Sequence, residues 1–159
     1  MEIKKIGVAG FGLMGGGIAQ VASQAGYKVI VLEAADEFLK KGFSALEKRL
    51  AGAVEKGKMA QADSEAIRDR IQGTTSAADM AGCDFIIEAI IENLDLKCKL
   101  FSELDKICPE HTIFASNTSS LTVIEMAMST KRPDRFVGMH FFNPVPVMKL
   151  VEVIRTVQL

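Results

Sequence analysis

The sequence has few of the features that mark secreted scaffolds, membrane spans or nucleic-acid surfaces. Its three cysteines are odd in number and lack CxxC spacing, which argues against a disulfide framework or a zinc site and favours the reducing cytoplasm. Lys plus Arg number 19 and Asp plus Glu number 20, so no basic excess indicates a nucleic-acid partner. The longest apolar stretch, residues 85–91, is interrupted by Glu88 and is shorter than the ~20 residues that a membrane helix needs. The N-terminus reads MEIKK and enters a strand-like segment at once, so we expect no signal peptide.

The remaining sequence is typical of one compact domain of alternating strands and helices. It has 159 residues, of which 48% are hydrophobic and 25% charged, without internal repeats or low-complexity segments. Short β-branched runs alternate with helical stretches, the pattern of a parallel sheet covered by helices. We expect strands at residues 5–9, 28–32, 74–75, 85–89, 112–115, 136–140 and 148–154. We expect helices at residues 13–25, 95–107 and 122–128, and two more within 36–72, with Asp36 as an N-cap and with Gly57 and Asp63-Ser64 marking the break between the two.

A glycine-rich turn follows the first expected strand. Gly10, Gly12 and Gly15 form G-x-G-x-x-G between a strand and a helix, the context in which this motif binds a dinucleotide pyrophosphate. Glu33 ends the second strand 18 residues after the last glycine, where an acidic side chain accepts hydrogen bonds from the adenosine ribose. Since such a carboxylate repels a 2′-phosphate, the pattern predicts NAD rather than NADP. The alternatives are glycines needed only for packing and a solvated glutamate at a strand end.

Four stretches go beyond a generic dinucleotide domain: GLMGGGIAQ (12–20), IEA with Glu92-Asn93 (87–93), ASNTSSL (115–121) and HFFNPVPVMKLVEV (140–153). Together they closely resemble the N-terminal NAD-binding domain of the 3-hydroxyacyl-CoA dehydrogenase family, especially bacterial 3-hydroxybutyryl-CoA dehydrogenases. The last stretch is the most specific, and the resemblance runs from Ile3 to the end of the chain. It implies a Rossmann-type, doubly wound, mainly parallel sheet over residues 1–159, with a helical pair inserted after the second strand.

The activity that the resemblance implies is NAD-dependent oxidation of (S)-3-hydroxyacyl-CoA, such as 3-hydroxybutyryl-CoA, to 3-oxoacyl-CoA in fatty-acid or butanoate metabolism. In this reading His140 is the general base, Glu152 orients it, and Ser119 donates a hydrogen bond to the substrate oxygen. Each has a plainer alternative: a structural histidine, a surface carboxylate, and a turn serine that bonds its own backbone. The other histidine, His111, is expected to be solvated.

The resemblance also implies further contacts with NAD. Leu13 and Met14 lie inside the glycine turn, and Asn143 matches an asparagine that contacts the cofactor. The segment that borders NAD contains Ile90, Ile91, Glu92 and Lys97. Without the resemblance, the isoleucines would be read as core, Lys97 as a solvated helix charge and Asn143 as part of an Asn-Pro turn. Asn117 and Ser120 are expected to form local turn hydrogen bonds.

Full-length family members carry a second, all-helical domain that builds the acyl pocket and the homodimer interface. The chain stops at Leu159 directly after an expected strand, so we expect that domain to be absent and the substrate site to be incomplete. Lysines on the inserted helical pair would meet the CoA phosphates, although interspersed glutamates suit a merely solvated face. Two other functions stay open: a dehydrogenase of another 3-hydroxy acid, and a non-catalytic NAD-binding or sensing module.

Overall fold

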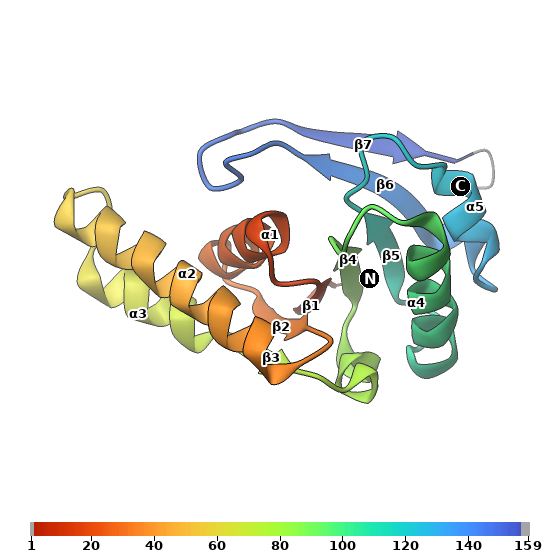
Figure 1. Ribbon diagram of the computed structural model, residues 1–159, viewed down its shortest axis with the longest axis horizontal. Helices are drawn as coiled ribbons and strands as arrows, with labels where there is room; N and C mark the ends of the chain where they lie inside the picture. Colours follow the sequence, from red (N-terminus) through yellow and green to blue (C-terminus); the bar gives the residue numbers. More distant parts are fainter. Residues whose placement is uncertain (1, 157–159) are drawn as a thin grey trace.

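A computed structural model describes residues 2–156, and in it one seven-stranded sheet organises the chain (Figure 1). The strand order is β3-β2-β1-β4-β5-β6-β7, and all neighbours are parallel except β6 and β7. The strands are β1 (Lys5–Ala9), β2 (Lys28–Leu32), β3 (Ile71–Thr74), β4 (Phe85–Glu88), β5 (Ile113–Ser116), β6 (Phe136–Phe141) and β7 (Val151–Arg155). The order reverses between β1 and β4, which creates a crevice at the carboxyl ends of these strands. The expected doubly wound, mainly parallel fold is confirmed.

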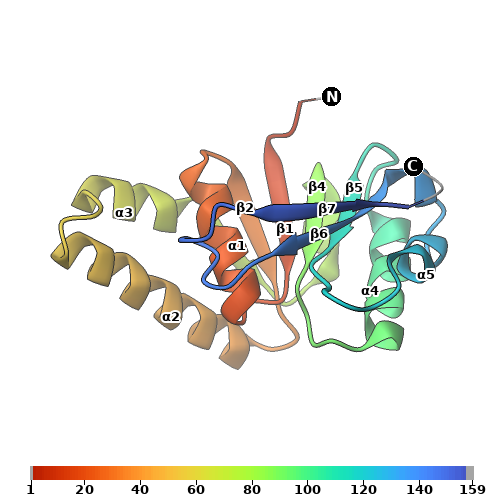
Figure 2. The ribbon, with the colours of Figure 1, turned by 90° about the horizontal axis from the view of Figure 1, so that it is seen from above.

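Helices cover both faces of the sheet (Figure 2). Helices α1–α3 pack on one face, and α4, α5 and the 3₁₀ turn η1 contribute to the core on the other. The inserted pair α2–α3 extends away from the sheet, as Figure 1 shows. The helical elements are α1 (Leu13–Gln24), α2 (Asp36–Glu55), α3 (Gln61–Asp69), η1 (Ala77–Gly82), α4 (Leu94–Ile107), α5 (Val123–Met128) and η2 (Pro133–Arg135).

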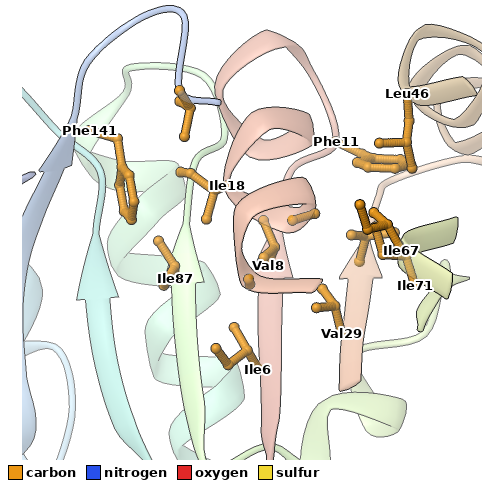
Figure 3. Close-up of a cluster of buried hydrophobic side chains, with 14 of the residues drawn as sticks. Ile6, Val8, Phe11, Ile18, Val29, Leu46, Ile67, Ile71, Ile87 and Phe141 are labelled. Carbon is orange, nitrogen blue, oxygen red and sulfur yellow. The ribbon is translucent and has the colours of Figure 1, made fainter. Parts of the chain in front are cut away.

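The alternating side chains of the strands divide the core into two clusters. In β2, Val29 and Val31 join one cluster, whereas Ile30 and Leu32 join the other. Figure 3 shows the first cluster, in which Val8 of β1 and Ile87 of β4 lie beside Ile18 of α1. Burial on both faces explains why the strands read as continuous apolar runs. It also makes the sheet a rigid platform for the loops at its carboxyl edge.

Three local expectations are wrong, and for the two at helix starts the competing signal is clear. Asp36 is the first residue of α2 and Ala35 is its N-cap, because an acidic side chain is also favourable in the first turn. Asp63 and Ser64 lie inside α3, where Asp63 is again a first-turn acid, and the break falls only near Gly57, with φ +68°. The weak strand expected at 74–75 spans Ile71–Thr74. The remaining expected elements differ from the observed ones by a few residues at most.

Candidate cofactor and catalytic site

A pocket of about 630 Å³ opens at the carboxyl ends of β1, β2 and β4. It lies at the reversal of strand order, where open α/β sheets place their ligands. Five of the predicted site residues line it: Gly10, Gly12, Glu33, Ile90 and Ile91, the last of which is 69% exposed. The pocket walls are otherwise mostly apolar. The structure therefore brings the glycine turn, the acidic strand end and the segment after β4 to one place.

The glycine turn is packed as tightly as its sequence suggests, with one exception. A Cβ on Gly10 would lie 2.6 Å from the Ala89 carbonyl oxygen, and one on Gly15 would lie 1.9 Å from the Gly10 carbonyl oxygen. Gly12 differs, because a Cβ there meets nothing within 4 Å and its φ of −76° suits any residue. The fold thus requires glycine at 10 and 15 but leaves the surface of Gly12 open.

That open surface lies at the N-terminus of α1. Gly12 is the N-cap residue of this helix, and no side chain accepts a hydrogen bond from the first amides there. The first amides of a helix have no acceptor inside the helix and give its N-terminus a partial positive charge. Leu13 extends from this turn with 68% of its surface exposed, and Met14 is half-buried. The turn can therefore hold an anionic group against backbone amides at Gly12, where no side chain intervenes.

Glu33 faces the turn from the end of β2. Its Oε1 accepts a hydrogen bond from the Phe11 amide at 2.6 Å, and its Oε2 accepts one from the Ala34 amide at 3.1 Å. Each carboxylate oxygen retains a further lone pair, so both can accept from a ligand. The side chain is thus fixed at the edge of the pocket rather than solvated at a free strand end.

A buried ionic cluster lies beneath the segment that follows β4. Lys97 of α4 is fully buried, and its Nζ lies 2.8 Å from Oε1 of Glu88 and 2.9 Å from Oε2 of Glu92. Glu88, also fully buried, accepts further hydrogen bonds from the Ser116 hydroxyl at 2.6 Å and the Ile90 amide at 2.7 Å. Lys97 therefore does not line the pocket in this structure, and reading it as a solvated charge is wrong. Its role is to join α4 to the ends of β4 and β5.

Glu92 connects this cluster to the turn after β5. Burial by itself raises its pKa, but hydrogen bonds from the Thr118 hydroxyl, Lys97 and the Ser119 amide outweigh that effect and hold the pKa below its usual value. The Ser119 side chain is exposed at the carboxyl edge of the sheet. The cluster thus fixes the backbone that carries Ser119.

His140 and Glu152 meet on the antiparallel β6–β7 hairpin, next to the carboxyl end of β6. They are register partners in β6 and β7, and His140 Nδ1 lies 2.9 Å from Glu152 Oε2. A carboxylate opposite Nδ1 holds the hydrogen there, which leaves Nε2 with a lone pair. The His140 ring also packs against Phe142, with ring centroids 4.6 Å apart. An imidazole held in this way can accept a proton at Nε2, which is the chemistry that a general base requires.

Asn117 links this hairpin to the neighbouring strand. Its Oδ1 accepts a hydrogen bond from the Phe141 amide at 2.8 Å, so the expectation of a purely local turn contact is wrong. The bond ties the end of β5 to the end of β6 beside His140. Ser120 does lie in a local turn, since its amide donates to the Thr118 hydroxyl. Asn143 is exposed in the loop after β6.

Sequence reasoning missed some of these roles. Glu88 was noted as an interruption of an apolar stretch and as part of a family motif but was given no role, yet a charged residue in a strand buried on both faces is itself a signal of a paired site. His111 is not simply solvated, since its Nε2 lies 3.3 Å from Asp84 Oδ1.

Within residues 2–156, no group of three His, Cys, Asp or Glu is placed to hold a metal ion. None of the helices in that range has the length and apolarity needed to cross a membrane.

Comparison with known proteins identifies the family. The sequence profile described as "3-hydroxyacyl-CoA dehydrogenase, NAD binding domain" matches residues 5–158. The chain belongs to this family. It is similar to a "probable 3-hydroxybutyryl-CoA dehydrogenase" of Bacillus subtilis, with 50% identity over 98% of the chain and 54% of that protein. The human mitochondrial hydroxyacyl-coenzyme A dehydrogenase is 47% identical over 97% of the chain and 51% of its own length.

The solved structures agree with this assignment to the 3-hydroxyacyl-CoA dehydrogenase family. The crystal structure of an (S)-3-hydroxybutyryl-CoA dehydrogenase from Ralstonia eutropha superposes with a TM-score of 0.96 at 44% identity, covering 99% of the chain and 56% of that protein. The chain thus spans about half the length of the relatives it matches. NAD is the cofactor of this domain family, and the open surface at Gly12, the helix N-terminus and the fixed Glu33 carboxylate fit it.

Proposed function

We propose that this NAD-binding domain serves an (S)-3-hydroxyacyl-CoA dehydrogenase, with 3-hydroxybutyryl-CoA as the substrate. The observation that carries the proposal is the His140–Glu152 pair at 2.9 Å, on the same edge of the sheet as the cofactor pocket. A general base at that edge is needed for oxidation of a hydroxyl group and has no use in a module that only binds NAD.

The pocket residues bind the two halves of NAD differently in this proposal. Gly10, Gly12 and Gly15, with Leu13 and Met14, hold the pyrophosphate against backbone amides at the start of α1. Glu33 accepts hydrogen bonds from the adenosine ribose and disfavours a 2′-phosphate. The nicotinamide half is bordered by a second set of residues: Ile90, Ile91, Glu92, Lys97, Ser119 and Asn143. Lys97 contributes from beneath, by holding Glu92 in place.

The catalytic residues act on the substrate hydroxyl. When bound, NAD supplies the hydride acceptor. His140 Nε2 takes the proton of the 3-hydroxyl, and Glu152 stabilises the charged imidazole that results. Ser119 donates a hydrogen bond to the oxygen that becomes the carbonyl, where negative charge develops.

The length of the relatives supports a second part of the proposal. A C-terminal helical domain, as in the family, completes the acyl-CoA site and forms a homodimer. The chain covers 54% of the Bacillus subtilis relative, and the rest of that protein is where such a helical domain is expected.

We also infer a cytoplasmic location, to which the three free cysteines are suited.

The test is a chimera in which this chain replaces the matching residues of the Bacillus subtilis relative. NADH oxidation is followed with acetoacetyl-CoA, for the chain alone and for the chimera. Turnover by the chimera, and its loss when His140 becomes Gln, is the expected result. A folded chimera that binds NADH but leaves acetoacetyl-CoA unreduced would contradict the proposal and direct the search to another 3-oxo acid.

A further inference from the structure

The cofactor pocket contains a second carboxylate, which comes from a helix other than the one that follows the glycine turn. Among the described residues that line the pocket, only Glu33 and Glu103 carry ionisable side chains. Glu33 lies at the end of β2 beside the turn, whereas Glu103 lies on α4, well beyond the start of that helix at the edge of the sheet. The dinucleotide-binding pattern that predicted Glu33 does not extend to Glu103.

Helix α4 presents Glu103 on the same face as two apolar side chains. Leu96, Leu100 and Glu103 have i, i+4, i+7 spacing, and all three line the pocket. Leu100 also packs against the core, so this wall is held in place from behind. Phe38, Thr75 and Ala77 line the same pocket. Together these side chains form a mostly apolar slot whose lining includes one exposed carboxylate, that of Glu103.

The position of this slot indicates which part of NAD it receives. The inference rests on the proposed binding of NAD at this pocket. With the pyrophosphate at the glycine turn and the adenosine ribose at Glu33, the adenine base would lie beyond Glu33, where Leu96, Leu100 and Phe38 line the pocket. A purine has two apolar faces and a polar edge, which suits apolar side chains accompanied by one carboxylate.

We propose that Glu103 accepts a hydrogen bond from the exocyclic amine of adenine and thereby makes the pocket selective for adenine dinucleotides. An ionised carboxylate can only accept hydrogen bonds, and the 6-amino group of adenine is a donor. In the part of the chain that the structure describes, no group donates a hydrogen bond to Glu103, so both of its oxygens are available. A 6-oxopurine would instead place a carbonyl acceptor against this acceptor.

The experiment compares NADH with reduced nicotinamide hypoxanthine dinucleotide, which carries a 6-oxo group in place of the 6-amino group. Binding of both to the chain is measured by the fluorescence of the reduced nicotinamide, without turnover. The wild-type chain should prefer NADH by about tenfold. Glu103→Gln should reduce that preference to within about twofold, because an amide both donates and accepts.

The matched control is Glu110→Gln, an exposed glutamate outside the pocket, which should keep the wild-type preference. Thermal unfolding of both variants checks that an exposed Glu→Gln change leaves the fold intact. Equal binding of the two dinucleotides by the wild type, or a preference that survives in Glu103→Gln, would overturn the role of Glu103. A wild-type chain that binds neither dinucleotide would contradict the proposed NAD site itself.

Discussion

His140 and Glu152 are twelve residues apart in sequence and directly opposite in the β6–β7 ladder, with Nδ1 and Oε2 separated by 2.9 Å. Backbone pairing therefore sets the distance between the two side chains. The His140 side chain is 20% exposed and that of Glu152 56% exposed, so the ring is partly enclosed while the carboxylate still meets solvent. The imidazole is held in orientation by an acceptor on its own hairpin.

The first prediction concerns this pair. In the chimera, His140→Gln should lower kcat by about 10²–10⁴-fold, because the proton of the hydroxyl loses its acceptor. Glu152→Gln should lower kcat less, since the ring remains but its orientation and charged form lose support. The NADH dissociation constant should stay unchanged in both variants, as measured by fluorescence titration. If the His140→Gln variant turned over at the wild-type rate, His140 would not be the general base.

Two glycine variants separate cofactor contact from folding. Gly12→Ala adds a Cβ into open space and should change the free energy of unfolding by less than about 1 kcal/mol, while weakening NADH binding by about tenfold or more. Gly15→Ala places a Cβ 1.9 Å from the Gly10 carbonyl oxygen and should cost about 3 kcal/mol or more. Urea unfolding and NADH titration measure the two effects. Unaltered NADH affinity in Gly12→Ala would show that the pyrophosphate lies elsewhere.

The buried cluster around Lys97 yields a prediction about stability. Lys97→Met leaves the buried carboxylate of Glu88 without its cation and should lower the free energy of unfolding by about 3–5 kcal/mol. Adding Glu88→Gln removes the uncompensated charge, so the double variant should be less destabilised than the sum of the single ones. Strict additivity in urea unfolding would argue against coupling between the two residues.

Asp84 yields a prediction about pH. Hydrogen bonds from the Lys4 and Lys5 amides hold its pKa below the usual value, with a smaller contribution from His111. A lowered native pKa stabilises the fold above the unfolded-state pKa of about 3.9, and this contribution is lost as the pH falls through the native value. Asp84→Ala should therefore cost about 1–2 kcal/mol at neutral pH.

The measurement for Asp84 is urea unfolding of the wild type and Asp84→Ala between about pH 7 and pH 2. The difference between the two proteins should be constant at neutral pH and shrink below about pH 4. Glu110→Ala, which removes an exposed carboxylate, serves as the control and should lower stability little at any pH. A difference for Asp84→Ala that is independent of pH would assign its effect to packing rather than to charge.

Much of the fold could be predicted because the sheet is buried on both faces. The apolar runs of β1, β2, β4 and β5 stand out from polar surroundings, and the glycine turn has a fixed place between strand and helix. The helix boundaries predicted at Asp36 and at Asp63-Ser64 were wrong. An aspartate stabilises a helix both as N-cap and in the first turn, so Asp36 and Asp63 give no unique boundary.

The site was harder to predict where distant segments meet. Lys97 looks like a surface charge in its own helix, and only the folded chain brings Glu88 and Glu92 to it. The bond from the Phe141 amide to Asn117 likewise joins residues 24 apart, which no local turn preference indicates. His140 and Glu152 were found only through their likeness to the family motif, because neither residue is distinctive alone.

The β6–β7 pairing also limits how the loop between the two strands can change. Side chains on a strand alternate between faces, so a shift of one residue in register turns Glu152 away from His140 without breaking the sheet. An insertion or deletion in residues 142–150 that shifts the pairing therefore separates the two side chains. The length of this loop thus constrains the pair in addition to the side chains that the loop carries, since Phe142 packs against the His140 ring and Val145 is buried in the core.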